Sequence, residues 1–175
     1  AFPITTFLIG LGVLVSVGTS IAVSRNMAAG KEDMANTYIR KGLLMFFIMA
    51  LLTTLAGFFT PEVMTLLGKG SDNYVVALAQ SFVSILLFGS FIYMAPIFLS
   101  DLLKNLGKPK EAMLAMIAGT LTTIVLDYIF IFLLELEMAG AALATIMGQL
   151  MAAFILLLLM RRQPIARVQP NRIRE

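Results

Sequence analysis

Five apolar runs of about twenty residues each divide this chain, and they constrain its fold more than any other feature. A helix needs about 20 apolar residues to cross the hydrocarbon core of a bilayer. A segment surrounded by lipid must also satisfy its own backbone hydrogen bonds, so each run is expected to be a helix. The expected spans cover residues 3–24, 42–60, 74–99, 112–134 and 138–160.

The overall composition supports a membrane protein. Hydrophobic residues make up 59% of the 175 positions, and charged residues only 13%. A soluble domain carries about a quarter charged residues. So much apolar surface cannot be buried inside one small globule, and the expected fold class is an all-α integral membrane protein.

The number of basic residues alternates from one connection to the next, which predicts the orientation of the chain. Following the five spans in order, the connections and the tail contain 4, 1, 3, 0 and 5 lysine or arginine residues. Cytoplasmic connections of membrane proteins collect lysine and arginine. We therefore expect the first and third connections and the basic tail, residues 161–175, in the cytoplasm. The N-terminal end of the chain is then expected outside.

The chain opens with AFPITTFLIG, an apolar run with no initiator methionine and no basic stretch ahead of it. A secretory signal peptide carries a basic stretch before its apolar segment. The opening is therefore not typical of a signal peptide, and we expect the chain to be a piece of a longer protein.

Missing residue types exclude several kinds of chemistry. The sequence has no cysteine and no histidine, which rules out disulfides, thiolate or imidazole metal sites and Cys/His catalysis. An intramembrane aspartyl protease needs two carboxylates within the membrane, and only one acid lies inside an expected span. We therefore expect no enzyme activity, no cofactor and no nucleic-acid partner.

The acid inside a span is Asp127, in the stretch TTIVLDYIFIF, residues 122–132. An ionised aspartate in the middle of a membrane costs roughly 2.5–3.5 kcal/mol on insertion scales. Such residues usually face a cavity or a partner, and they mark ion or proton pathways. Asp127 is therefore the first candidate for a functional residue in this chain.

Three residues share the helix face of Asp127. Met116, Thr120 and Thr123 precede it, and the successive spacings of 4, 3 and 4 place all four on one stripe. Thr123 lies one turn from the carboxylate and offers it a side-chain oxygen. We expect Met116 and Thr120 to line a cavity on the same face.

The turn ELEMAG brings the next span back beside this face. Thr145 is expected at the depth of Asp127, and Gln149 one turn deeper, where it would line the cavity. Asp127, Thr123 and Thr145 then form a site that binds a coupling ion, either H+ or Na+. A second interpretation stays open, in which the aspartate hydrogen-bonds the threonines and simply holds two helices together.

Small residues repeat every four positions on two of the expected helices. The ridges consist of Gly12, Ser16, Ser20 and Ser24 on the first span, and Gly140, Ala144, Gly148 and Ala152 on the fifth. Small side chains let helix backbones approach closely in lipid. Both ridges therefore predict helix packing inside a bundle.

The third expected span has a start signal and a proline. Asp72 precedes it and is suited to cap the first helical turn. Pro96 lies near its cytoplasmic end. Because proline disrupts the hydrogen bonding of the turn before it, we expect a kink there.

Four stretches resemble the multidrug and toxic compound extrusion (MATE) family of transporters. ITTFLIGLGVLVSVGTSIAVSRNMAAGKEDMA resembles the family's second helix and the loop after it, and LSDLLKNLGKPKEAM the loop after the fourth helix. TTIVLDYIFIF resembles the fifth helix, and EMAGAALATIMGQ the start of the sixth. Their order and spacing agree along almost the whole chain.

The resemblance implies a twelve-helix fold in two six-helix lobes, of which this chain supplies helices two to six of the N-terminal lobe. The expected partners are membrane lipid, the missing first helix, the C-terminal lobe and small cationic or amphipathic substrates. Such transporters are thought to export these substrates from a bacterial or archaeal cell in exchange for Na+ or H+.

The resemblance also implies roles for three residues. The family's ion-binding aspartate, a residue one turn before it and a sixth-helix threonine fall on Asp127, Thr123 and Thr145. The family prefers asparagine where this chain has Thr123, which leaves sodium selectivity open.

Two other functions remain as alternatives to a drug antiporter. The first is a lipid-linked sugar flippase of the same superfamily, which tends to hold phosphate with basic groups in its central cavity. The expected spans of this chain contain no such groups. The second is a membrane scaffold without transport activity, in which nothing requires a carboxylate within the membrane.

Overall fold

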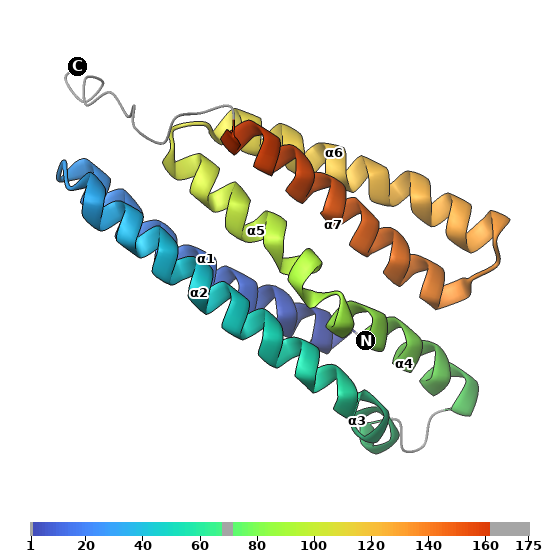
Figure 1. The fold of residues 1–175 in the computed structure, drawn as a ribbon. Helices are drawn as coiled ribbons and strands as arrows, with labels where there is room; N and C mark the ends of the chain where they lie inside the picture. Colours follow the sequence, from blue (N-terminus) through green and yellow to red (C-terminus); the bar gives the residue numbers. More distant parts are fainter. Residues whose placement is uncertain (1, 68–71, 162–175) are drawn as a thin grey trace.

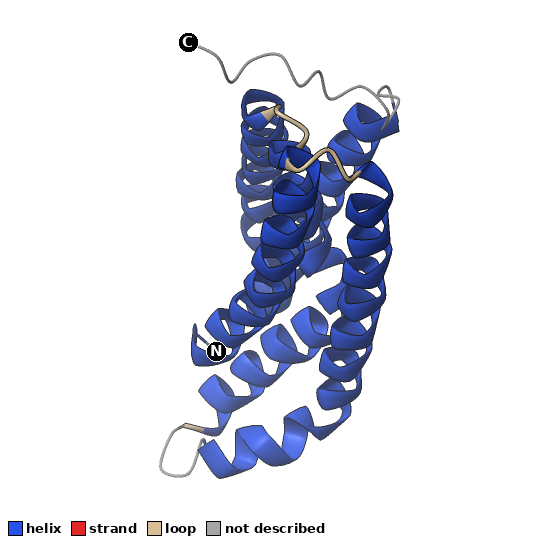
Figure 2. Cartoon of the chain, turned by 90° about the vertical axis from the view of Figure 1, so that its left-hand side faces the viewer, coloured by secondary structure: helices blue, strands red, loops and turns tan. Residues whose placement is uncertain are grey.

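The computed structural model describes residues 2–67 and 72–161, and this part of the chain is helical with short connections and no strand (Figure 2). The all-α prediction is therefore confirmed. Along the chain the elements are α1 (Phe2–Ala28), α2 (Glu32–Ala56), a 3-10 turn (Gly57–Phe59), α3 (Thr60–Leu67), α4 (Asn73–Phe88), α5 (Ser90–Asn105), α6 (Pro109–Asp127), a π-helical segment (Tyr128–Leu133) and α7 (Glu137–Arg161).

Two helical hairpins lie on either side of a central bent helix (Figure 1). The first hairpin is α1 with α2, and the second is α6 with α7. The central element is α4 followed by α5, and α5 contacts α1 of the first hairpin and α7 of the second. Helices α1 and α7, which are distant in sequence, therefore both pack along α5.

Four helical stretches are long and apolar enough to cross a membrane, and α4 with α5 makes a fifth if the bent pair is one span. The bend of 56° lies at Gly89, seven residues before Pro96. Pro96 is buried inside α5, which continues through it. The expected kink at Pro96 is therefore wrong in its position.

The bend is explained by the conformation and the contacts of Gly89. This residue leaves the helical conformation, with φ −87° and ψ 10°. A β-carbon there would overlap the side chain of Ile146 from α7. The sequence pointed to proline as the helix breaker, but the contact with a residue far along the chain selects the glycine instead.

Helix α2 begins ten residues before the apolar run that predicted it. Glu32 and Asp33 occupy its first turn, where negative charge interacts favourably with the helix dipole. Asp72 caps α4 as expected, because its side chain accepts a hydrogen bond from the Tyr74 backbone N–H at 3.1 Å.

Three apolar clusters hold the central helices to the hairpins. One joins α4 to α7 through Val83, Leu86 and Ala142. The other two join α5 to the second and first hairpins; their buried members are Leu99, Leu103, Ala112, Ala115, Ala153 and Leu156 in one, and Val15, Phe46, Met94, Phe98 and Leu102 in the other. In lipid these contacts stabilise the bundle through close packing.

Hydrogen bonds between side chains also join the central bent helix to the two hairpins, at two points along its length. The Tyr74 hydroxyl of α4 donates to Glu137 Oε1 of α7 at 2.7 Å. At the bend, Ser90 Oγ lies 2.9 Å from Thr53 Oγ1 of α2 and 3.0 Å from Thr54 Oγ1. The α4 end of the central element is thus bonded to the second hairpin, and its middle to the first.

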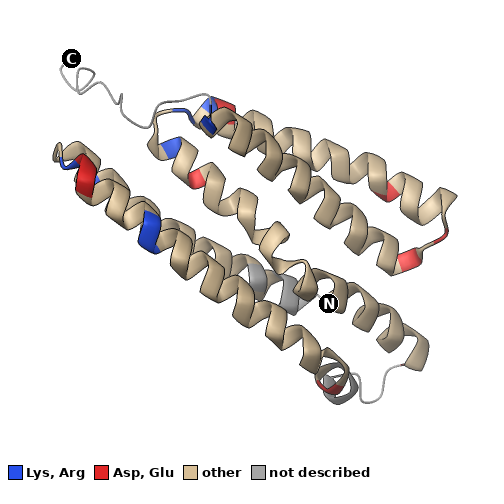
Figure 3. Cartoon of the chain, viewed as in Figure 1, with Lys and Arg blue, Asp and Glu red and all other residues tan. Residues whose placement is uncertain are grey.

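The lysines and arginines of the described helices gather at one end of the bundle (Figure 3). This end carries the α1–α2 connection, the α5–α6 connection and the end of α7. The opposite end carries Glu135 and Glu137 in the α6–α7 turn. The prediction that the basic end faces the cytoplasm agrees with this separation and stays a prediction.

Candidate functional site

Asp127 is the last residue of α6 and is partly buried. One of its carboxylate oxygens, Oδ1, is buried and has no hydrogen-bond partner among the described residues. A buried acceptor without a donor is costly, and such atoms in a folded protein call for an explanation. The binding of a proton or a cation by Asp127 stays a prediction, and this unpartnered oxygen is the observation that bears on it.

The helix changes its geometry immediately after Asp127. Residues Tyr128–Leu133 form a π-helical segment, in which the Leu134 N–H donates to the Ile129 carbonyl five residues earlier, at 3.0 Å. Short π-helical segments within α-helices often occur at functional sites. The sequence analysis did not find this segment, because its residues are apolar like those of an ordinary span.

Contacts between α6 and α7 define how the second hairpin is aligned. A β-carbon added to Gly119 would lie 2.6 Å from the Ala152 β-carbon. One turn further along, a β-carbon added to Gly148 would overlap Thr123 Oγ1. The predicted ridge of small residues on α7 therefore packs directly against α6.

The same alignment places Asp127 opposite Ala144. Near the turn, a β-carbon added to Gly140 would lie 3.1 Å from the Phe130 β-carbon, which continues the antiparallel series. Ala144 is fully buried, and Thr145 follows it. The alignment agrees with the prediction that Thr145 lies at the level of Asp127.

The two threonines of the predicted ion site donate to their own helices. Thr123 Oγ1 donates to the Gly119 carbonyl at 3.2 Å, and Thr145 Oγ1 donates to the Ala141 carbonyl at 2.8 Å. Neither hydroxyl has a hydrogen bond to Asp127 within the described part of the chain. The described residues therefore contain no hydrogen bond of the kind that the second interpretation requires, in which Asp127 holds the two helices together through the threonines.

The remaining predicted site residues have different surroundings. Met116 packs against the apolar cluster that joins α5, α6 and α7. Thr120 is exposed and donates to the Met116 carbonyl at 3.0 Å, and Gln149 is partly buried on α7. Their role in lining a substrate cavity stays a prediction.

Comparison with known proteins identifies the family. The family model MatE matches residues 1–129, which is well over half of the chain. The chain belongs to the MatE family. The resemblance inferred from the four sequence stretches is thereby confirmed.

The relatives of this MatE chain include export proteins. It is 26% identical over 170 residues to the multidrug export protein MepA of Staphylococcus aureus (strain NCTC 8325 / PS 47), covering 95% of this chain and 37% of that protein. MepA of Staphylococcus saprophyticus is 25% identical over 178 residues, with 98% and 38% covered. The MatE chain therefore spans less than two fifths of the length of these relatives.

Solved structures of transporters share the fold. An inward-facing multidrug resistance MATE family transporter of the MOP superfamily aligns with a TM-score of 0.86 and 28% identity, covering 96% of this chain and 38% of that one. A MOP superfamily transporter from Pyrococcus furiosus, whose structure title reports a binding pocket of reverse polarity and suggests a different function, aligns with a TM-score of 0.85 and 29% identity, covering 96% and 37%. The MatE chain is thus a multi-pass membrane protein.

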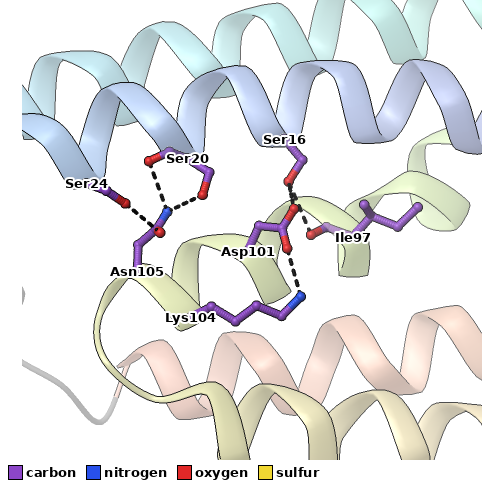
Figure 4. A network of polar contacts seen from close by, with 7 residues as sticks. All are labelled: Ser16, Ser20, Ser24, Ile97, Asp101, Lys104 and Asn105. Atoms are coloured by element: carbon purple, nitrogen blue, oxygen red, sulfur yellow. Dashed lines mark hydrogen bonds and ion pairs between the residues drawn. The ribbon is translucent and has the colours of Figure 1, made fainter.

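The MatE chain also has a polar network between α1 and α5 (Figure 4) that sequence analysis missed. Ser16, buried on α1, donates to Asp101 Oδ2 at 2.5 Å. The other oxygen of Asp101 pairs with Lys104 Nζ at 2.9 Å. Asp101 lies two residues beyond the expected third span, but the structure places it within α5, facing the first hairpin.

The same network continues one turn further. Asn105 Nδ2 donates to Ser20 Oγ at 2.7 Å, and Ser24 Oγ donates to Asn105 Oδ1 at 2.8 Å. The serine ridge of α1 therefore forms directed hydrogen bonds in addition to close packing. A sequence signal existed, because Asp101 and Asn105 have the same four-residue spacing as the serines.

Proposed function

We propose that the full-length protein is a cation-coupled multidrug antiporter, and that this chain supplies its coupling carboxylate, Asp127. The proposed substrates are cationic or amphipathic compounds exported from a bacterial cell. The similarity to MepA supports the substrate class. The observation that carries the coupling role is the buried Asp127 Oδ1, which lacks a hydrogen-bond donor among the described residues.

The surrounding groups suit a coupling ion. An ionised carboxylate at this depth is unfavourable unless it gains a proton or a cation. The hydroxyl hydrogens of Thr123 and Thr145 are engaged with backbone carbonyls, so their oxygens face any ligand as acceptors. A proton needs only Asp127, whereas Na+ would bind Asp127 together with Thr123 and Thr145 oxygens.

Binding and release would change the charge at the junction of α6 and the π-helical segment. Secondary transporters expose a central site alternately to the two sides by moving one bundle against the other. Neutralising Asp127 lowers the cost of enclosing it in an apolar environment. In the proposed cycle, the bound ion therefore favours the closed arrangement of this lobe, and its release favours the open one.

The alternatives have less support. A flippase for lipid-linked sugars would hold phosphate with basic groups near mid-membrane, whereas the lysines and arginines of the described helices lie at one end of the bundle. A scaffold without transport activity gives no reason for the unpartnered carboxylate oxygen. We therefore favour the antiporter.

The test measures efflux of a cationic fluorescent dye by the full-length protein across a range of pH and sodium concentrations. Asp127→Asn keeps the size of the side chain but cannot exchange a proton, so efflux should fall at least tenfold. Asp127→Glu should keep part of the activity. Efflux that follows pH but not sodium supports proton coupling, and the reverse supports sodium coupling.

The matched control is Glu135→Gln, which removes an exposed acid from the nearby turn. This variant should pump like the wild type. Normal efflux by Asp127→Asn under every condition would reject Asp127 as the coupling residue.

A further inference from the structure

A cavity of about 320 Å³ opens between α2, α5 and α7. Its walls are Leu43 and Phe47 of α2 and Phe154 and Leu157 of α7, and Ala95 of α5 lies between them. The surface that lines it is wholly apolar. A polar drug or an ion would lose its hydrogen bonds to water in this cavity without gaining new ones. A hydrocarbon chain has no hydrogen bonds to lose and can bind there without this cost.

We call this open cavity the groove. Each of its two walls leads to an arginine, and both arginines lie towards the same end of the bundle. On α2, Arg40 precedes Leu43 by three residues and Phe47 by seven. These spacings place the three side chains on one helix face. Arg40 is exposed and forms no ion pair within the described residues.

The other wall has the same pattern. On α7, Arg161 follows Leu157 by four residues and Phe154 by seven, so it continues their stripe. Arg161 is also exposed and unpaired within residues 2–67 and 72–161. Each wall of the apolar groove thus leads along its own helix to an exposed arginine on the side of the basic end of the bundle.

We propose that this groove binds an anionic phospholipid. One acyl chain lies against the phenylalanines of α2 and α7, and the phosphate lies between Arg40 and Arg161. Charge complementarity selects this occupant, because guanidinium groups bind phosphate with paired hydrogen bonds. Basic pockets between membrane helices recognise anionic head groups in the same way. The inference depends on the membrane location of the chain and not on its transport activity.

The test uses native mass spectrometry of the full-length protein with phosphatidylglycerol and phosphatidylcholine that carry identical chains. The wild type should bind phosphatidylglycerol more tightly. The double variant Arg40→Gln with Arg161→Gln should lower the affinity for phosphatidylglycerol by about fivefold per arginine removed. One basic side chain near a head group contributes about 1 kcal/mol to binding. Phosphatidylcholine binding should not change.

The matched control is Lys31→Gln with Lys110→Gln, which removes two exposed charges from the same end of the bundle away from the groove. It should leave both lipids bound as in the wild type. An arginine variant that keeps its preference for phosphatidylglycerol, or a control that loses as much, would overturn the proposal.

A second arm locates the acyl chain directly, first on the wild-type protein. Phosphatidylglycerol with a diazirine on its chain should crosslink to the peptides that contain Phe47 or Phe154. Filling the groove with Ala95→Phe should lower this crosslinking severalfold. Crosslinks found only elsewhere would mean that another part of the protein or a second copy covers the groove, and would contradict the proposal.

Discussion

Asp101 and Asp127 are both aspartates within helices, but the structure surrounds them differently. Asp101 accepts from Ser16 and pairs with Lys104, so both of its oxygens have partners. Asp127 has a buried oxygen without one among the described residues. At the residue scale, the first carboxylate therefore has a structural role, and the second is the one that we propose exchanges with an ion.

The structural role of Asp101 predicts a loss of stability when its donor is removed. Ser16→Ala should lower the stability of the full-length protein by about 0.6 kcal/mol and by no more than about 1.7 kcal/mol, the average and the maximum measured for hydrogen bonds between membrane helices. Thermal unfolding in detergent measures the change. Ser81→Ala is the control, because Ser81 is exposed and bonds only within α4. Equal effects of the two variants would contradict the role.

Thr123 offers a test of ion selectivity. Thr123→Asn introduces an amide oxygen with longer reach, which should increase the response of efflux to sodium severalfold while keeping its pH response. Dye efflux in paired sodium and potassium buffers measures this response. Thr122→Asn makes the same change on a different helix face and should have no such effect. An unchanged sodium response in Thr123→Asn would count against Thr123 as a ligand.

At the scale of the element, α7 fits against α6 because its ridge consists of glycine and alanine. Gly148 lies where Thr123 leaves no room for a β-carbon. The ridge was legible in the sequence, since small residues recur at helical spacing. The partners of the serine ridge on α1 could not be read from the sequence, because they depend on which helix lies opposite.

The close contact predicts that Gly148→Ala destabilises the protein. The added methyl group should cost about 1–3 kcal/mol, as overpacking does in other cores. Thr123→Ala should recover part of this loss when the two changes are combined. The control is Gly18→Ala, where a β-carbon meets nothing within 4 Å. Thermal unfolding of the four variants would reject the contact if Gly148→Ala were as stable as Gly18→Ala.

At the scale of the whole molecule, the spans and the family were predictable, because apolar runs and basic connections follow directly from the physics of the bilayer. The bend at Gly89 and the π-helical segment after Asp127 were not. The bend depends on packing between distant parts of the chain, because Gly89 contacts Ile146. The π-helical segment gives no signal, because its residues are apolar like those of an ordinary span. That Thr145 lies at the level of Asp127 stays a prediction, which rests on the short turn between the two antiparallel helices.

The chain spans less than two fifths of its relatives, which leads to a prediction about transport. Alternating access needs two bundles that move about a shared site. These 175 residues, expressed alone, should insert into the membrane but export no dye above background. The full-length protein under the same promoter is the control. Measurable efflux by the shorter chain would contradict the requirement for a second bundle.

The polar contacts of the bent central element have a mechanical consequence. The end of α5 is bonded to α1 through Asp101 and Asn105, and the start of α4 is bonded to α7 through Tyr74 and Glu137. The element therefore runs diagonally from one hairpin to the other. A diagonal connection resists shear between the two hairpins while leaving rotation of the whole lobe unopposed, so the lobe is expected to move as a rigid unit.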